Sequence, residues 1–172
     1  MATSLLTPND QASAKAESRG GKYLIFHLGE EEFGIQVQRV REIMGVLEIT
    51  KVPQTPAHIK GVINLRGKVI PVVDLRLKFS MPEMEYTQRT CIIVVQVAGT
   101  HSPTLMGIVV DGVVEVLNIA GTDVEDTPSF GKEVEVPYVM GLAKLKGRVK
   151  ILLDIDQVMT ARELARLDLT AK

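Results

Sequence analysis

The chain has 172 residues, of which 45% are hydrophobic and 24% charged, as is usual for a folded globular protein. Its 20 lysines and arginines nearly balance 21 aspartates and glutamates, so a net charge of −1 gives no overall attraction to nucleic acid or anionic lipid. Aromatic residues make up only 4%, and the core must therefore consist mainly of Val, Ile, Leu and Met. The single cysteine, Cys91, excludes an intramolecular disulfide and a cysteine zinc cluster.

The N-terminal region gives no signal for a membrane or for secretion. Residues 1–21 are rich in small and polar residues without a sustained period, which predicts a flexible N-terminal tail. They lack the charged start and continuous apolar stretch of a secretory signal. No segment of the sequence reaches the roughly 18 consecutive apolar residues of a membrane-spanning helix. The sequence therefore predicts a cytoplasmic protein.

Short runs of β-branched and other apolar residues, bounded by glycine, proline or asparagine, begin at Lys22. The first two runs flank an acidic turn at Gly29–Glu31 and predict a β-hairpin. The remaining predicted strands are Val46–Val52, Val62–Leu65, Lys68–Val73, Cys91–Val97, Leu105–Val110, Val113–Ile119, Tyr138–Leu145 and Arg148–Leu153. Many short strands at close spacing favour an all-β barrel or sandwich over alternating strands and helices.

The connecting segments also have recognisable patterns. Ser80–Arg89 is polar and contains a proline, which predicts a connection between two halves, and Ala98–Thr104 predicts a long hairpin loop. From Asp156 onward, apolar residues near helical spacing and good helix formers predict a C-terminal helix over residues 156–168, with Asp156 as its cap.

An internal repeat is the most specific feature of the chain. Gly61–Leu75, GVINLRGKVIPVVDL, matches Gly141–Ile155, GLAKLKGRVKILLDI, when Gly61 is aligned with Gly141. An earlier pair of segments, Phe33–Met44 and Met106–Leu117, matches when Gly34 is aligned with Gly107. The same motifs in the same order predict two related β modules. In each module a glycine lies between two basic residues at a predicted hairpin tip.

Enzymatic and ligand sites have little support in the sequence. Asp74 and Asp154 occupy equivalent repeat positions, as in an aspartic hydrolase dyad, but neither precedes the hydroxyl residue and glycine that such a dyad needs. They are expected to bind nearby backbone amides. The glycine-containing stretch that ends at Lys68 lacks the Ser or Thr of a phosphate loop. The 3 histidines lie far apart, with no second ligand at metal spacing.

Oligonucleotide binding is the second alternative, since small barrels can bind nucleic acid through a basic groove and aromatic side chains. Lys60–Lys78 has five basic residues and one acidic residue, whereas Glu115–Glu135 has six acidic residues and one basic residue. This complementary charge favours contacts between proteins. Val37, Val40 and Ile43, spaced by three, predict either a helical turn or loop over a barrel mouth, or an apolar strip that receives a partner helix.

Four blocks follow one another along the chain: YLIFHLGEEEFGI from Tyr23, VREI from Val40, PAHIKGVINLRGKVIPVVDLR from Pro56 and GIVVDGVVEVL from Gly107. Together these blocks resemble the CheW family of bacterial chemotaxis coupling proteins. The resemblance covers about residues 22–168, expected to form a CheW-like domain. No kinase, phosphotransfer or receiver segment flanks the blocks. A standalone coupling protein is therefore favoured over the matching domain of the histidine kinase CheA or of a CheV-type fusion.

The resemblance implies an all-β fold of two pseudo-symmetric five-stranded SH3-like barrels with a short C-terminal helix. One barrel is expected to comprise about residues 33–80 and the other residues 22–32 plus 89–155. The implied function is a non-catalytic adaptor that couples the cytoplasmic tip of chemoreceptors to the regulatory domain of CheA at membrane-associated receptor arrays. No cofactor, metal, nucleic acid or membrane insertion is expected.

Site residues carried over by motif fall into two groups. The receptor-binding positions are Val37, Val40, Glu42, Asn64, Arg66 and Gly67, and the kinase-binding positions are Tyr138 and Leu142, within the Tyr138–Leu142 region. Arg66, at a hairpin tip, can bind a carboxylate or helix C-terminal carbonyls with its planar guanidinium. The second repeat has Lys146 at that place, so the two barrels are not expected to bind one partner equivalently. The predicted Ala98–Thr104 loop is longer than the family's usual turn.

Overall fold

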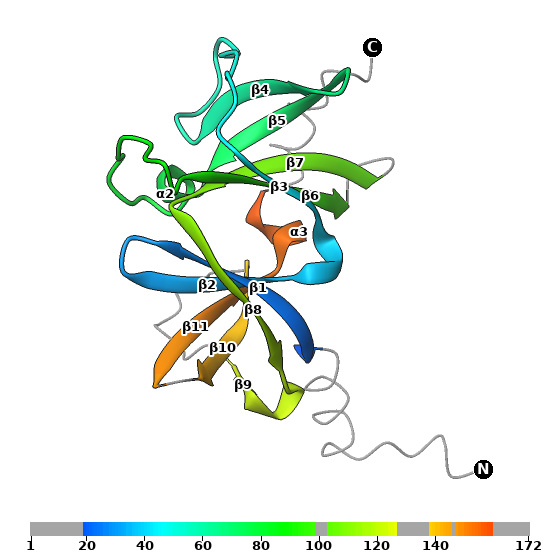
Figure 1. Cartoon of the computed structure of the whole chain (residues 1–172), viewed down its shortest axis with the longest axis vertical. Helices are drawn as coiled ribbons and strands as arrows, with labels where there is room; N and C mark the ends of the chain where they lie inside the picture. Colours follow the sequence, from blue (N-terminus) through cyan, green and yellow to red (C-terminus); the bar gives the residue numbers. More distant parts are fainter. Residues whose placement is uncertain (1–18, 99–102, 127–137, 146, 160–172) are drawn as a thin grey trace, which may run out of the picture.

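The computed structural model describes residues 19–98, 103–126, 138–145 and 147–159. Two β-sheets contain most of these residues. Figure 1 shows them one above the other, with the short helix α3 (Ile155–Val158) between them and α2 (Leu75–Lys78) at one side. The predicted all-β fold of two modules is therefore confirmed.

Each sheet forms one barrel. The sheet of the β1–β2 barrel has the strand order β8-β1-β2-β11-β10-β9, and its strands are Gly112–Ile119 (β8), Gly21–Leu28 (β1), Glu31–Gln36 (β2), Arg148–Leu153 (β11), Val139–Leu145 (β10) and Val124–Glu125 (β9). The sheet of the β6–β7 barrel has the order β3-β6-β7-β5-β4, and its strands are Val40–Gly45 (β3), Cys91–Ala98 (β6), Pro103–Val110 (β7), Lys68–Asp74 (β5) and Ile59–Leu65 (β4). The two-residue β9 is the sixth strand of a sheet predicted to have five.

The two repeats exchange strands, so each barrel contains strands from both. The β1–β2 hairpin pairs with β8 and β11, whereas the β6–β7 hairpin pairs with β3 and β5. The chain crosses between barrels twice, at the 3-10 turn η2 (Val37–Arg39) and at Asp111. The β6–β7 barrel is therefore residues 40–110, and the β1–β2 barrel is residues 21–36 plus 112–153.

This exchange corrects the predicted boundaries of 33–80 and of 22–32 plus 89–155. β2 stays with β1 because the two form one hairpin, and β6 and β7 lie between β3 and β5 because they hydrogen-bond to both. Strand pairs joined by long connections are set by hydrogen bonding in three dimensions. A sequence repeat identifies equivalent strands but leaves their pairing partners open.

Equivalent glycines on β2 and β7 allow close approaches of neighbouring side chains. A Cβ added to Gly34 would lie 3.0 Å from the side chain of Leu152, and one added to Gly107 would lie 2.9 Å from Ile92. These two glycines are aligned with each other in the sequence repeat. Both lie on the strands that form parallel pairs, β2 with β11 and β7 with β5. A side chain at either glycine would therefore require the neighbouring Leu or Ile side chain to shift.

Three clusters of buried side chains form the core. One lies inside each barrel, around Ile25 and Leu152 in the β1–β2 barrel and around Ile63 and Ile92 in the β6–β7 barrel. The third and largest joins the two sheets and α3. Within the third cluster, a row of four stacked rings, Phe26, Phe33, Phe79 and Tyr138, has centroid separations of 5.8, 5.6 and 4.9 Å. The scarce aromatic residues are thus concentrated where the barrels meet.

Several predicted boundaries shift in the structure. Arg19 is buried and β1 begins at Gly21, so the end of the predicted tail is ordered, while residues 1–18 lie outside the described residues. Strand pairing extends to Ala98 and Pro103, which leaves a shorter loop than the predicted Ala98–Thr104. Of the predicted strand Val46–Val52, one residue, Thr50, forms an isolated bridge, to Val62.

The aspartates at the ends of β5 and β11 each cap a helical turn. Asp74 accepts a hydrogen bond from the Leu77 amide at 3.3 Å, and Asp154 accepts one from the Asp156 amide at 3.1 Å. This agrees with the backbone-binding role predicted for them and gives separate tasks to the two carboxylates of the hypothetical dyad. The C-terminal helix begins at Ile155 with Asp154, not Asp156, as its cap, and residues 160–168 of the predicted helix lie outside the described residues.

Candidate docking surfaces

A polar groove lies on the β6–β7 barrel beside the tip of the β4–β5 hairpin. Its volume is about 390 Å³, and its lining residues are Arg41, Glu42, Leu65, Arg66, Lys68, Val94, Gln96, Pro103 and Leu105. β3, β6, β7 and the β4–β5 hairpin all contribute to it. Three cationic side chains and one carboxylate give the groove a net positive charge, which suits an acidic segment of a partner.

Four of the predicted receptor-binding residues lie at this groove or at its edge. The Arg66 guanidinium donates to Glu42 Oε1 at 2.7 Å, and the Gly67 amide donates to Asn64 Oδ1 at 2.9 Å. Arg66 and Gly67 have φ values of 53° and 87°, so the hairpin tip is a tight turn with two positive φ angles. Asn64 stabilises that turn, and the turn places Arg66 beside β3.

The ion pair at the groove is weak enough to exchange partners. The Arg66 side chain is 74% exposed and the Glu42 side chain 29%. Exposed pairs of this kind contribute about 0–1 kcal/mol. Arg66 can therefore leave Glu42 for a carboxylate of another protein at little cost.

Val37 and Val40 precede the groove residue Arg41 in the chain, and their local structure differs from that predicted. Val37 begins the 3-10 turn η2, whereas Val40 is the first residue of strand β3. β3 alternates between partly buried and exposed residues because it pairs with β6, so the expected helical turn through Ile43 is wrong. Both valines pack partly against the inter-barrel cluster, and Ile43 is 44% exposed. The apolar strip is therefore a strand edge with an exposed isoleucine.

The predicted kinase-binding residues Tyr138 and Leu142 lie at different depths. The Tyr138 ring stacks on Phe79 within the inter-barrel cluster, and burial raises the pKa of its hydroxyl. Leu142 lies four residues along, about 13 Å at the usual rise of a strand. There it pairs with Ile151 of β11 on one side and Glu125 of β9 on the other. Tyr138 therefore connects β10 to the barrel junction, and Leu142 lies half-buried in the middle of β10, between β11 and β9.

A set of exposed apolar side chains lies on the two barrels, and the sequence analysis singled out Ile43 but not the others. They are Ile43, Leu47 and Val69 on the β6–β7 barrel, and Val114, Val116 and Val149 on the β1–β2 barrel. The repeat aligns Ile43 with Val116 and Val69 with Val149, so these four occupy equivalent places in the two barrels. Exposed apolar residues in such groups are typical of protein-binding surfaces. The alternation of valine with polar residues in β8 was the available signal.

A buried ion pair holds the barrels together at the second crossover. Arg76 donates to Asp111 through Nε at 2.7 Å and through Nη2 at 2.6 Å, and its Nη1 donates to the Pro82 carbonyl at 3.1 Å. The Gly29 amide, at the tip of the β1–β2 hairpin, donates to the same carboxylate at 2.7 Å. Burial raises the pKa of Asp111, but the hydrogen bonds from Arg76 and Gly29 outweigh it and leave that pKa below its usual value.

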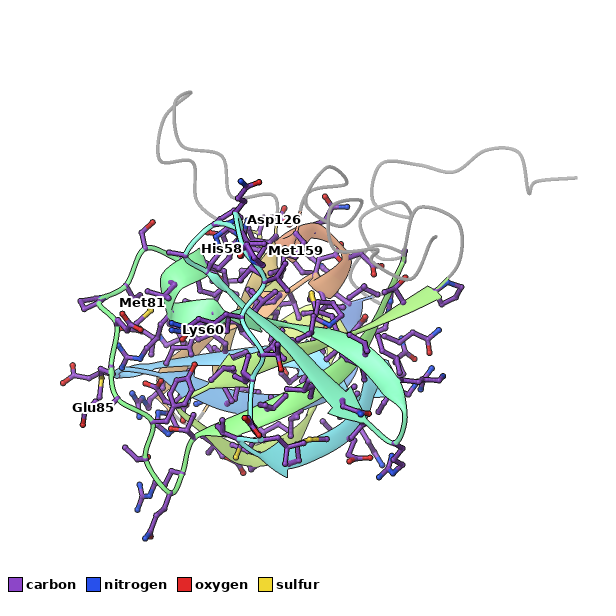
Figure 2. All side chains as sticks on the ribbon, turned by 90° about the horizontal axis from the view of Figure 1, so that it is seen from above. His58, Lys60, Met81, Glu85, Asp126 and Met159 are labelled. Carbon is purple, nitrogen blue, oxygen red and sulfur yellow. The ribbon has the colours of Figure 1, made fainter. Side chains whose placement is uncertain are left out.

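Side-chain contacts hold the connection between α2 and β6 against one side of the molecule. Figure 2 labels Lys60, Met81 and Glu85 there. Lys60 pairs with Glu83 at 2.8 Å, and the Tyr86 hydroxyl donates to Asp74 at 3.3 Å. Burial and the nearby Asp74 carboxylate raise the pKa of Tyr86. These contacts make the connection part of the folded structure.

A second buried ion pair joins the two repeats within the β1–β2 barrel. Lys150 of β11 and Glu32 of β2 are directly opposite in a parallel pair, and the Lys150 ammonium donates to the Glu32 carboxylate. Their side chains are only 3% and 12% exposed. The hydrogen bond from Lys150 lowers the pKa of Glu32 below its ordinary value, despite the opposing effect of burial.

The lowered pKa values of Glu32 and Asp111 predict loss of stability in acid. A carboxyl whose pKa is lower in the folded state stabilises the fold above its unfolded pKa, about 4, and this stabilisation is lost as pH falls through the folded pKa. We expect the urea midpoint to fall steeply below about pH 4.5. Glu32→Gln, which keeps an oxygen for Lys150, should show a smaller pH slope in the same range. An equal slope in the variant and the wild type would contradict this role of Glu32.

Within the described residues, neither a metal-binding group nor a membrane-spanning helix is present. Across residues 19–98, 103–126, 138–145 and 147–159, no group of three or more His, Cys, Asp or Glu side chains is arranged to hold a metal ion. In the same part of the chain, no helix has the length and apolar character required to cross a membrane.

Comparison with known proteins decides the family. A model of the CheW-like domain matches residues 22–163. The chain belongs to the CheW-like family. The chemotaxis protein CheW of Klebsiella aerogenes is 39% identical over 156 residues, covering 91% of this chain and 92% of the relative. The chemotaxis protein CheW of Rhizobium meliloti is 36% identical over 152 residues, covering 88% and 96%.

A solved CheW-like structure has the same fold. The crystal structure of the scaffolding protein TtCheW from Thermoanaerobacter tengcongensis matches with a TM-score of 0.75 and 32% identity, covering 84% of this chain and 97% of that protein. The resemblance found in the sequence is thus confirmed at the level of the CheW-like family. Its relatives carry the names of chemotaxis and scaffolding proteins.

Proposed function

We propose that this chain is a non-catalytic chemotaxis adaptor that couples chemoreceptors to the histidine kinase CheA. The observation that carries the proposal is a CheW-like fold whose two barrels expose distinct surfaces at equivalent places in the repeats. An adaptor needs two such surfaces and no reacting groups. The proposed location is cytoplasmic, at membrane-associated receptor arrays.

The proposed receptor surface is the groove on the β6–β7 barrel. Its positive character and the exposed Arg66 fit an acidic, helical receptor tip, with Ile43 and the neighbouring valines as apolar contacts. Glu42 and Asn64 would orient the Arg66 hairpin tip, and Gly67 would permit its turn. Val37 and Val40 would support β3 from beneath as well as contact the receptor.

The proposed kinase surface is on the β1–β2 barrel and includes the Tyr138–Leu142 region. Leu142 is the outer contact, whereas Tyr138 fixes β10 to the barrel junction through its stacked ring. Two weak contacts on one rigid chain give a much higher effective concentration than either contact alone. This bivalent docking is the proposed mechanism of coupling.

Arg66→Glu tests the receptor surface. We expect this charge reversal to leave the fold intact, because the side chain is largely exposed, and to weaken binding of a receptor tip fragment at least about 10-fold, about 1.4 kcal/mol. Calorimetry with the full chain measures the affinity. Lys146→Glu, at the equivalent repeat position, is the matched control and is expected to bind the receptor fragment normally. Equal losses in both variants, or no loss in Arg66→Glu, would refute the groove assignment.

A further inference from the structure

The two crossovers between the barrels are fastened by equivalent ion pairs of opposite polarity. At the second crossover, Asp111 pairs with Arg76, which follows β5. At the first crossover, Arg39 pairs with Asp156, which follows β11. Arg76 and Asp156 are aligned in the repeat, since each comes two positions after the aligned aspartates Asp74 and Asp154. The member that follows the strand is thus basic in one pair and acidic in the other, while the crossover members Asp111 and Arg39 lie one position out of register, since Asp111 aligns with Gln38.

The surrounding hydrogen bonds are similar in the two pairs. The Gly29 amide, at the end of the β1–β2 hairpin, donates to Asp111 at 2.7 Å. The Ala98 amide, at the corresponding end of β6, donates to Asp156 Oδ1 at 2.8 Å. Phe26 and Val95 occupy equivalent places in the two hairpins. Gly29 and Ala98 each come three residues later, so they are equivalent as well. In each case one carboxylate thus accepts hydrogen bonds from a backbone amide at a hairpin end and from an arginine side chain.

The two pairs differ in burial, and this difference makes the first crossover the one that can open. The Arg76 and Asp111 side chains are 10% and 20% exposed, whereas Arg39 and Asp156 are 31% and 23% exposed. Greater contact with water reduces the stabilisation that an ion pair contributes. Opening at Arg39–Asp156 therefore costs less than opening at Arg76–Asp111.

The Arg39–Asp156 pair also connects the two proposed docking surfaces. Arg39 lies between Val37 and Val40, and its Nη1 donates to the Gln96 carbonyl at 3.0 Å, while the side chain of Gln96 accepts a hydrogen bond from Arg41 in the groove. On the other side, Asp156 is in α3, next to Asp154 and Ile155.

The contacts around α3 lead to the proposed kinase surface. The Asp154 amide donates to the Tyr138 carbonyl at 2.8 Å, and the side chain of Asp154 caps α3. Fixing Asp156 therefore fixes the start of β10. A continuous series of hydrogen bonds runs from Arg41 through Gln96, Arg39 and Asp156 to the segment that holds Tyr138.

We propose that Arg39 and Asp156 are positioning residues, and that their ion pair transmits occupancy of the groove to the Tyr138–Leu142 surface. This inference rests on the proposed adaptor function. A receptor in the groove holds η2 and β3 in place, which favours the closed ion pair; the closed pair holds α3 and β10 in the arrangement that binds the kinase. Such coupling requires that the two states of the pair differ in affinity for each partner.

The test measures this coupling in the full chain by calorimetry. The affinity for the kinase regulatory domain is determined with and without a saturating receptor tip fragment. In the wild type we expect the receptor fragment to raise that affinity about 5-fold or more. Asp156→Asn, which keeps an oxygen for the Ala98 amide but loses the charge, should reduce the ratio to about one.

Two further variants separate a positioning role from a merely structural one. The double variant Arg39→Asp/Asp156→Arg reproduces the polarity of the Asp111–Arg76 pair and is expected to restore the ratio. Lys60→Gln removes the Lys60–Glu83 pair, which lies outside the series of contacts, and should leave the ratio unchanged. A wild-type ratio in Asp156→Asn, or a ratio of one in a wild type that binds both partners, would overturn the proposal. Failure of the wild type to bind either partner would overturn the proposed function itself.

Hydrogen exchange at the Ala98 amide gives a second measurement, independent of the double variant's folding. The receptor fragment is expected to slow exchange at Ala98 in the wild type, because it favours the closed pair, and to have no such effect in Asp156→Asn. Unchanged exchange at Ala98 in a wild-type complex with the receptor would also overturn the proposal.

Discussion

Asp111→Ala is expected to lower the free energy of unfolding by about 3–5 kcal/mol. The substitution leaves the Arg76 guanidinium, 10% exposed, without its carboxylate and removes the acceptor of the Gly29 amide. An unpaired buried charge is costly because neither water nor an opposite charge compensates for its removal from solvent. The effect is measured as a lower urea midpoint, with the slope of the transition unchanged if unfolding remains two-state.

The matched control for this prediction is the exposed ion pair between Lys60 and Glu83. Glu83→Ala removes a pair of similar length, 2.8 Å, whose carboxylate is 64% exposed. Its urea midpoint is expected to stay close to that of the wild type, because water replaces the lost contact. Similar midpoints for the two variants would show that the Arg76–Asp111 contact does not hold the barrels together.

The second large effect is expected at the buried pair in the β1–β2 barrel. Lys150→Ile leaves the Glu32 carboxylate, 12% exposed, without its cation and should lower the free energy of unfolding by about 3 kcal/mol. Equilibrium urea unfolding measures it. Without the Lys150 cation the buried Glu32 carboxyl has a higher pKa and becomes protonated more readily. The destabilisation should therefore be smaller at low pH, where the carboxyl is neutral.

The other barrel provides the rescue for this substitution. The places equivalent to Lys150 and Glu32 are held by Ile70 and Leu105, which pack in the interior cluster of the β6–β7 barrel. Glu32→Leu/Lys150→Ile copies that pair and is expected to lie within about 1 kcal/mol of the wild type. A double variant less stable than Lys150→Ile alone would show that the destabilisation has another cause than the unpaired charge.

The repeat made much of the fold predictable from sequence. The glycines at 67 and 147, each between two basic residues, correctly predicted the β4–β5 and β10–β11 hairpins, because the tight turns hold these residues at positive φ. The alignment of the earlier pair of segments correctly related Gly34 to Gly107. These features are local, because the backbone conformation at one position restricts the residue type at that position.

Pairing between distant segments was not predictable in the same way. β3 was interpreted as a possible helical turn because Val37, Val40 and Ile43 are three residues apart, yet hydrogen bonding to β6 makes the segment from Val40 a strand. The exchange of strands between repeats likewise depends on hydrogen bonds across the whole chain. A single sequence contains no record of these partners.

The candidate site likewise combines local features, which were predictable, with contacts between distant segments, which were not. The Arg66 hairpin tip and its Asn64 support were predictable, since both follow from one local motif. The partner of Arg66, Glu42, comes from another strand, and the Arg39–Asp156 pair joins residues near opposite ends of the described chain. Such contacts arise from tertiary structure, and only the folded arrangement of the crossovers brings them together.

Reconstitution of a receptor tip fragment and the CheA kinase, with and without this chain, is the most direct test of the proposed adaptor role. Co-sedimentation on receptor-bearing vesicles, together with kinase activity, measures whether the kinase is held at the receptor and stimulated. We expect both to require the full chain and Arg66→Glu to reduce both greatly. Equal recruitment and stimulation of the kinase in the absence of the chain would contradict its role as the coupling adaptor.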